Sequence, residues 1–99
     1  MKCIAVDGLP DDPIAAAGVF HQHWLAHVED VLGKGEDVAI LVPSADHTHR
    51  EWRLAIVTGL ARKHTPRRVN MIAGEGGKAD ATLAYLADAP GITGQYLAT

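Results

Sequence analysis

Four side chains with catalytic potential, Ser44, Asp46, His47 and His49, closely follow an apolar segment that predicts a strand. The carboxyl ends of strands are where α/β proteins place their sites. A serine, a histidine and an aspartate are the residue types of a hydrolase triad, with Ser44 as the nucleophile. Residues so close in sequence seldom reach triad geometry, however, and the Gly-x-Ser-x-Gly motif is absent. Helix capping by Ser44, Asp46 or Thr48 is the simpler interpretation.

A glycine-rich turn offers a second candidate site. Gly74, Glu75, Gly76, Gly77 and Lys78 connect a predicted strand to a predicted helix. Backbone N–H groups at a helix start can bind a small anion. The segment lacks the ending and spacing of a phosphate-binding P-loop, and Glu75 would repel phosphate. An ordinary flexible turn is the alternative.

Six histidines are many for 99 residues. His23 and His27 are four positions apart and so share a helix face, while His47 and His49 lie in a predicted loop. Such a set suits zinc or nickel. The sequence has no His-Glu-x-x-His motif, and Cys3 is its one cysteine. We therefore expect no metal site.

The elements that would position these residues alternate along the chain. Apolar runs bounded by turn residues predict strands. Between them, Asp12 and Pro13 predict a helix start, and a Thr48/Glu51 capping box predicts another. Strands are expected at Lys2–Val6, Val38–Val42, Val69–Ala73 and Gln95–Ala98, and helices at Ile14–Leu32, from Thr48 to before Pro66, and at Ala79–Ala87. This order predicts an α/β fold with a parallel sheet of three or four strands and three helices.

Composition narrows the class of protein. The chain has 99 residues, 47% of them hydrophobic, and so suits one small globular domain. A net charge of −3 makes a nucleic-acid partner unexpected. No apolar run is long enough for a signal peptide or a membrane span. With a single cysteine, these features predict a cytoplasmic location without membrane association.

Two fragments of the sequence are similar to segments of a known protein family. Leu60–Pro66 leads into Arg68–Ala73, which contains Arg-Val-Asn, and the tail Ala84–Leu97 contains Ile-Thr-Gly-Gln. In this order, on a helix, a strand and a tail, they resemble the C-terminal half of the short-chain dehydrogenase/reductase family. The resemblance runs from about Asp37 to the C-terminus. It implies a truncated Rossmann-like half-domain with three layers that occupies residues 1–99.

The same resemblance brings out what differs from that family. The chain lacks the family's Thr-Gly-x-x-x-Gly-x-Gly turn for a dinucleotide, so no cofactor is expected. Counting back without gaps from Leu60 places the catalytic tyrosine position at Asp46 and the lysine position at Arg50. Ser44 stands where the family serine would be. Asp46 does not simply replace the tyrosine, because an ionised aspartate cannot donate a proton. Arg50 does not simply replace the lysine, because its guanidinium is planar and offers a fork of donors where lysine has a compact ammonium group. Ser44, Asp46 and Arg50 are therefore only weak catalytic candidates.

The family also implies how the chain could associate. In the resembled family, the helices matching Asp12–Leu32 and His49–His64 form a four-helix interface between subunits. The apolar side chains on them are expected to form such an interface here: Phe20, Trp24, Val28, Trp52, Ile56 and Leu60. The alternative is that these side chains face the chain's own sheet. The first strand should be a sheet edge with unpaired backbone groups, which is also an association site.

The sequence therefore predicts a non-catalytic short-chain-dehydrogenase-like protein that acts as an assembly or accessory subunit. The expected partner is a second copy or a full-length short-chain dehydrogenase. The alternatives are an oxidoreductase component completed by such a partner, or a small hydrolase using Ser44. A small-ligand binder at Gly74–Gly77 is a third possibility.

Overall fold

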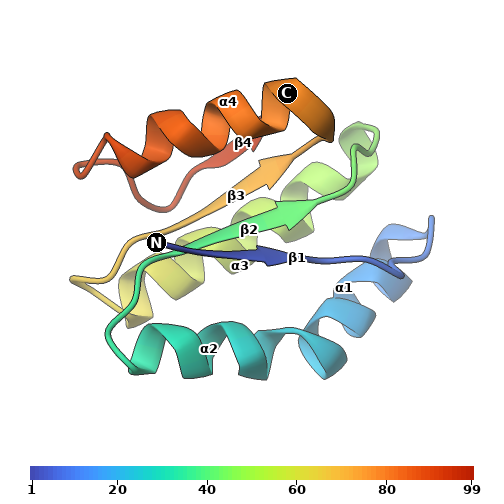
Figure 1. Ribbon diagram of the computed structural model, residues 1–99. Helices are drawn as coiled ribbons and strands as arrows, with labels where there is room; N and C mark the ends of the chain where they lie inside the picture. The colour runs from blue at the N-terminus through green and yellow to red at the C-terminus, as the bar shows by residue number, and fades with distance from the viewer.

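The computed structural model describes residues 1–99 and shows one parallel sheet between two helical layers (Figure 1). The strands lie in the order β1-β2-β3-β4, and every neighbouring pair is parallel. The predicted α/β fold is therefore confirmed. In chain order the elements are β1 (Lys2–Ala5), α1 (Pro13–His23), α2 (Leu25–Gly33), β2 (Val38–Val42), the short 3-10 helix η1 (His47–His49), α3 (Arg50–Lys63), β3 (Val69–Ala73), α4 (Gly76–Ala87) and β4 (Tyr96–Ala98).

Strand β2 is the element around which both cores form. Its side chains alternate, so Ile40 enters the larger core and the neighbouring Ala39 enters the smaller one. Ile40 is in register with Ile4 of β1 and Met71 of β3, which extends the larger core across three strands. Burial on both faces explains why this segment is apolar at every position.

The two faces of the sheet are covered unequally. Helices α1, α2 and α3 pack on one face, while α4 alone lies on the other, above β3 and β4 (Figure 1). Ala39 and Ile72 are buried under α4. Cys3 and Ala5 of β1 are exposed, so the covering ends before the edge strand. The position of β1 at the sheet edge is confirmed.

The single helix expected over Ile14–Leu32 is a wrong prediction. The chain forms two helices that meet at Trp24, whose φ and ψ of −120° and −33° are not helical. The break lets the chain turn along the sheet, so that Phe20 before it and Val28 after it are both fully buried. There are consequently four α-helices rather than three. The helix start at Asp12 is confirmed, since its carboxylate accepts a bond from the N–H of Ala15 at 2.9 Å.

Two other helix starts also differ from prediction. No Thr48/Glu51 capping box forms, because Asp46 accepts bonds from the N–H and hydroxyl of Thr48 and α3 begins at Arg50. Helix α4 begins at Gly76, three residues earlier than expected. The end of α3 before Pro66 is confirmed, since the helix stops at Lys63.

Candidate functional site

Ser44 lies at the carboxyl end of β2 and is held by Glu75 at the start of α4. The N–H of Ser44 donates to Oε1 of Glu75 at 3.0 Å, and its hydroxyl donates to Oε2 at 3.2 Å. A carboxylate that bridges two donors in this way ties the β2–α3 connection to the β3–α4 connection. The Ser44 hydroxyl donates to this carboxylate and not to a histidine, so no Ser-His pair is formed.

His49 has both ring nitrogens engaged elsewhere. The indole Nε1–H of Trp52 donates to Nδ1 at 3.0 Å, and Nε2 lies 2.8 Å from the carbonyl oxygen of Asp11. Because the indole can only donate, we assign the ring proton to Nε2, which donates to the carbonyl. His49 is buried, and in this arrangement it is neutral. It therefore connects the β1–α1 loop to α3 and does not serve Ser44 as a base.

Asp46 caps the chain between β2 and α3. Its Oδ1 accepts the N–H of Thr48 at 3.0 Å and also the Thr48 hydroxyl. These two bonds, the hydroxyl first, lower the pKa of the Asp46 carboxyl below its ordinary value. Asp46 is therefore ionised at neutral pH. Of the three capping candidates, Asp46 is the residue that caps.

Arg50 opens α3 and is exposed. Its guanidinium lies 5.7 Å from the centre of the Tyr96 ring, within cation–π range. The other histidine of this segment, His47, is exposed in η1. Thus Ser44, Asp46 and Arg50 all lie near the carboxyl end of β2, but they contact three different residues: Glu75, Thr48 and Tyr96 respectively.

The most unusual side chain of this region is Arg53, which the sequence interpretation missed. Only 2% of its surface is exposed. Its Nη1 donates to the carbonyl of Pro43 at 2.9 Å and to the hydroxyl of Tyr96 at 3.2 Å, whereas Nε has no hydrogen-bond partner. The guanidinium lies 5.5 Å from the Trp52 ring centre. No carboxylate forms an ion pair with it.

A signal for Arg53 was present in the sequence. Position 53 precedes Ile56 and Val57 by three and four residues, so it belongs to the buried face of α3. A charged residue on an apolar helix face is unusual enough to mark a site candidate. Its partners Pro43 and Tyr96 lie too far away in sequence to be found from local spacing.

A cavity of about 340 Å³ opens beside these residues, at the carboxyl ends of β1 and β2. The β1–α1 loop forms one wall, and the β2–α3 connection with the first turn of α3 forms the other. Its lining residues are Leu9, Pro10, Asp11, Pro43, Ser44, Ala45, Asp46, His49 and Arg53. The site therefore combines one buried cation, one buried neutral imidazole and two exposed carboxylates.

The sequence matches a known family over residues 4–99, described as short chain dehydrogenase-like protein. The chain belongs to the short chain dehydrogenase-like family. The resemblance inferred from the Arg-Val-Asn and Ile-Thr-Gly-Gln fragments is thereby confirmed. No curated protein and no solved structure gives a significant match.

In the glycine-rich turn, Glu75 and Gly74 both contact other parts of the chain. Gly76 and Gly77 form the first turn of α4, and Glu75 is bonded to Ser44. Gly74 has a φ of +144° and lies against the side chain of Thr99, which leaves no room for a Cβ. Anion binding by Gly74, Gly76 and Gly77 remains a prediction.

The apolar side chains expected at a subunit interface form much of the chain's own core. Phe20 and Val28 have no exposed surface, and Ile56 and Leu60 retain less than a tenth of theirs. Trp24 and Trp52 are partly buried against the same core. Phe20 and Val28 therefore pack on the chain's own sheet and do not form a surface for a second subunit. These two side chains are not available to a partner in this structure.

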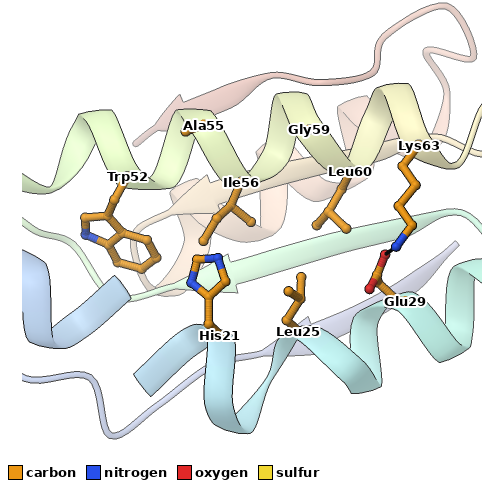
Figure 2. A pocket seen from close by; sticks show the side chains of 9 residues that line it. All are labelled: His21, Leu25, Glu29, Trp52, Ala55, Ile56, Gly59, Leu60 and Lys63. Atoms are coloured by element: carbon orange, nitrogen blue, oxygen red, sulfur yellow. Dashed lines mark ion pairs between the residues drawn. The ribbon is translucent and has the colours of Figure 1, made fainter. Parts of the chain in front are cut away.

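What remains open to a partner is a groove of about 420 Å³ between α1–α2 and α3. Figure 2 shows Trp52, Ile56 and Leu60 of α3 facing His21 and Leu25 across it. Glu29 and Lys63 meet at one end, at 2.6 Å, and His64 approaches the same carboxylate at 2.9 Å. Bonds from Lys63 and then His64 lower the pKa of Glu29. The groove is thus mainly apolar with a charged end.

Metal sites and membrane-spanning helices are two further classes of feature to consider in this chain. No group of three or more histidine, cysteine, aspartate or glutamate side chains is placed to hold a metal ion, and this includes His23 and His27. None of the helices combines the length and apolar character needed to cross a lipid bilayer.

Proposed function

We propose that this chain is a non-catalytic member of the short chain dehydrogenase-like family that acts as an assembly or accessory subunit. The observation that carries the proposal is the state of Asp46, at the position matching the family tyrosine. Its lowered pKa keeps the carboxylate ionised, so it has no proton to donate at neutral pH. General acid catalysis requires a group that holds its proton at the working pH.

The neighbouring positions support the same conclusion. Arg50 stands at the lysine position, but its guanidinium lies over the Tyr96 ring and forms no ion pair with Asp46. Ser44 donates its hydroxyl proton to Glu75. The three positions therefore do not act as a unit, which argues against an oxidoreductase and against a Ser44 hydrolase alike.

The assembly role is supported by the groove between α1–α2 and α3. Leu25, Trp52, Ala55, Ile56 and Gly59 give it a largely apolar lining. Open apolar surface on a small domain is a common mark of an interface. In the resembled short-chain dehydrogenases, the helices at these positions meet their counterparts in another subunit. We therefore place the contact to a second copy, or to a full-length short-chain dehydrogenase, at this groove.

A charge placed in the groove tests this proposal. Gly59 has open space where a Cβ would be added, so Gly59→Glu introduces a carboxylate without an internal clash. Gly18→Glu is the matched control, since Gly18 is also helical, exposed and free of neighbours but lies outside the groove. Both variants gain helix propensity on loss of glycine, by about 0.5–1 kcal/mol. Any difference between them therefore reports on the groove.

Two measurements are made on each variant. Light scattering after size exclusion gives the mass in solution, and tagged pull-down from the native cell extract with mass spectrometry identifies a captured dehydrogenase. We expect a dimer, or stoichiometric capture of a full-length short-chain dehydrogenase, for the wild type and Gly18→Glu and not for Gly59→Glu. A monomeric wild type that captures no such dehydrogenase would refute the assembly role. Reductase or hydrolase activity of the purified chain would refute the non-catalytic one.

A further inference from the structure

The charge of Arg53 has no counter-ion in the chain. The side chain is 2% exposed, and none of the four ion pairs includes it. Transfer of an unpaired charge from water into a protein interior is strongly unfavourable. The Trp52 and Tyr96 rings, at 5.5 and 6.0 Å, and the Pro43 carbonyl offset part of this cost. They supply partial charges only, so the site still lacks an anion.

The hydrogen bonds of Arg53 also leave one edge of the guanidinium without partners. Both of its bonds come from Nη1, to Pro43 and Tyr96, and Nε is a buried donor with no acceptor. Nε and Nη2 form the side-on edge of the guanidinium, which matches the two oxygens of a carboxylate. A buried donor is rarely left without a partner in a folded protein. The edge that is left unbonded is therefore the one suited to a bidentate anion.

Arg53 forms part of the wall of the 340 Å³ cavity at the carboxyl ends of β1 and β2. This volume is at the small end of the range for ligand pockets, which is about 300–1,000 Å³. The cavity is also where parallel sheets bind small molecules. A ligand of few heavy atoms fits both the size and the position.

The remaining polar groups of the cavity restrict the kind of anion. Asp11 and Asp46 also line it, and their carboxylates would repel a phosphate dianion. Both bonds that Thr48 makes to Asp46 fall on Oδ1, so Oδ2 is free to accept a bond from a ligand. His49, neutral with both nitrogens bonded, adds no charge. The lining thus provides one fork for a carboxylate and acceptors for a neighbouring donor group.

We propose that this cavity binds a small carboxylic acid that carries an ammonium or hydroxyl group next to its carboxylate. The Arg53 guanidinium would donate hydrogen bonds to the carboxylate. The Asp11 and Asp46 carboxylates would accept from the ammonium or hydroxyl. This function goes beyond the assembly role and does not depend on it. An amino acid and a hydroxy acid share the required chemistry, and the test distinguishes them.

The test is a calorimetric titration of the full chain with L-alanine, L-lactate, acetate and inorganic phosphate. It is repeated with Arg53→Leu, which removes the guanidinium, and with Arg53→Lys, which keeps the charge but removes the fork. Arg62→Leu is the matched control, because Arg62 lies exposed on the same helix outside the cavity. Thermal unfolding of each variant shows that it is folded.

We expect saturable binding of L-alanine or L-lactate to the wild type and to Arg62→Leu, and weaker binding of acetate. Loss of a bidentate charge-assisted contact should weaken this binding by at least about tenfold in both Arg53 variants. The tighter of the two acids identifies the ligand as an amino acid or a hydroxy acid. The proposal is overturned if no acid binds, if phosphate or acetate binds as tightly as both acids, or if folded Arg53 variants bind like the wild type.

Discussion

Arg53 and Arg68 lie at opposite ends of the sheet and have opposite surroundings. Arg68 directly precedes β3, where its Nε donates to Asp37 at 3.1 Å and its Nη1 donates to the carbonyls of Leu86 and Ala89. Its N–H also donates to Asp37, at 2.8 Å. Arg53, at the carboxyl end of β2, has no carboxylate partner. At one end of the sheet the buried arginine is paired within the chain, whereas at the other end it has no counter-ion and lies beside an open cavity.

The end of the sheet at which the strands begin, here called the amino end, is therefore stabilised by contacts within the chain. Asp37 and Arg68 connect the start of β2 to the start of β3, and the two carbonyls extend this connection to the end of α4. Both side chains are largely buried, with 24% and 15% of their surface exposed. Burial alone would raise the Asp37 pKa, but hydrogen bonds from the Arg68 N–H and side chain outweigh it and lower the pKa. Folding and ionisation of Asp37 thus favour each other.

The largest expected effect comes from removing the satisfied arginine. Arg68→Met should lower the free energy of unfolding by about 2–3 kcal/mol, because Oδ2 of Asp37 and two carbonyls lose their side-chain donor and the Asp37 charge loses its ion-pair partner. This corresponds to a fall in Tm of roughly 10–20 °C for a domain of this size. Arg53→Leu, in the same thermal and urea unfolding, should change the free energy by no more than about 1 kcal/mol. Equal losses from the two substitutions would mean that Arg53 stabilises the fold as much as Arg68 does.

The second effect is the pH dependence of the amino end. A carboxyl whose folded pKa is lowered contributes stability at pH values above its unfolded pKa of about 3.9, and this stability is lost as the pH falls through the folded pKa. Asp37→Asn removes the contribution of Asp37. The free energies of unfolding measured in urea from pH 7 down to pH 2 should therefore converge for wild type and Asp37→Asn as the pH falls, from a difference of about 1–2 kcal/mol at neutral pH. A constant difference across this range would contradict the role given to the Asp37 charge.

Glu29 provides a check on that interpretation. Its pKa is also lowered, by Lys63 and His64, but the Lys63 side chain is 67% exposed and screened by water. Glu29→Gln should therefore give a smaller convergence than Asp37→Asn in the same series. A larger convergence would place the acid sensitivity at the helical groove instead of at the amino end.

The sequence was sufficient to predict the central strands. Val38–Val42 and Val69–Ala73 are predicted with their observed bounds, because strands buried on both faces are apolar at almost every position, and Asn70 is the one polar residue of the two. The break at Trp24 was not predictable from periodicity, since apolar spacing continues through it. The break allows both Phe20 and Val28 to pack in the core against the sheet, and this packing depends on the tertiary fold and not on local sequence.

The candidate site shows the same limit more clearly. The predicted strand Val38–Val42 and the family resemblance together place Ser44, Asp46 and Arg50 near one strand end, and the structure has them there. Spacing did not indicate that Ser44 would bond to Glu75, 31 residues away, or that Arg53 would bond to Tyr96, 43 residues away. Such pairs are created by the fold, which brings segments far apart in the sequence side by side around the parallel sheet. The residues at this strand end were therefore predictable, whereas their partners were not.

The smallest expected effect concerns the bond between Ser44 and Glu75. It is exposed, so water replaces the hydroxyl when it is lost, and Ser44→Ala should change the free energy of unfolding by at most about 0.5 kcal/mol. Glu75→Gln, which keeps the shape but removes the charge, is the control and should behave similarly in urea unfolding. A loss above about 1.5 kcal/mol from either substitution would mean that the carboxyl end also holds the fold together. The open charge of Arg53 would then be the exception within a structural region, and the contrast between the two ends of the sheet would reduce to a contrast between two arginines.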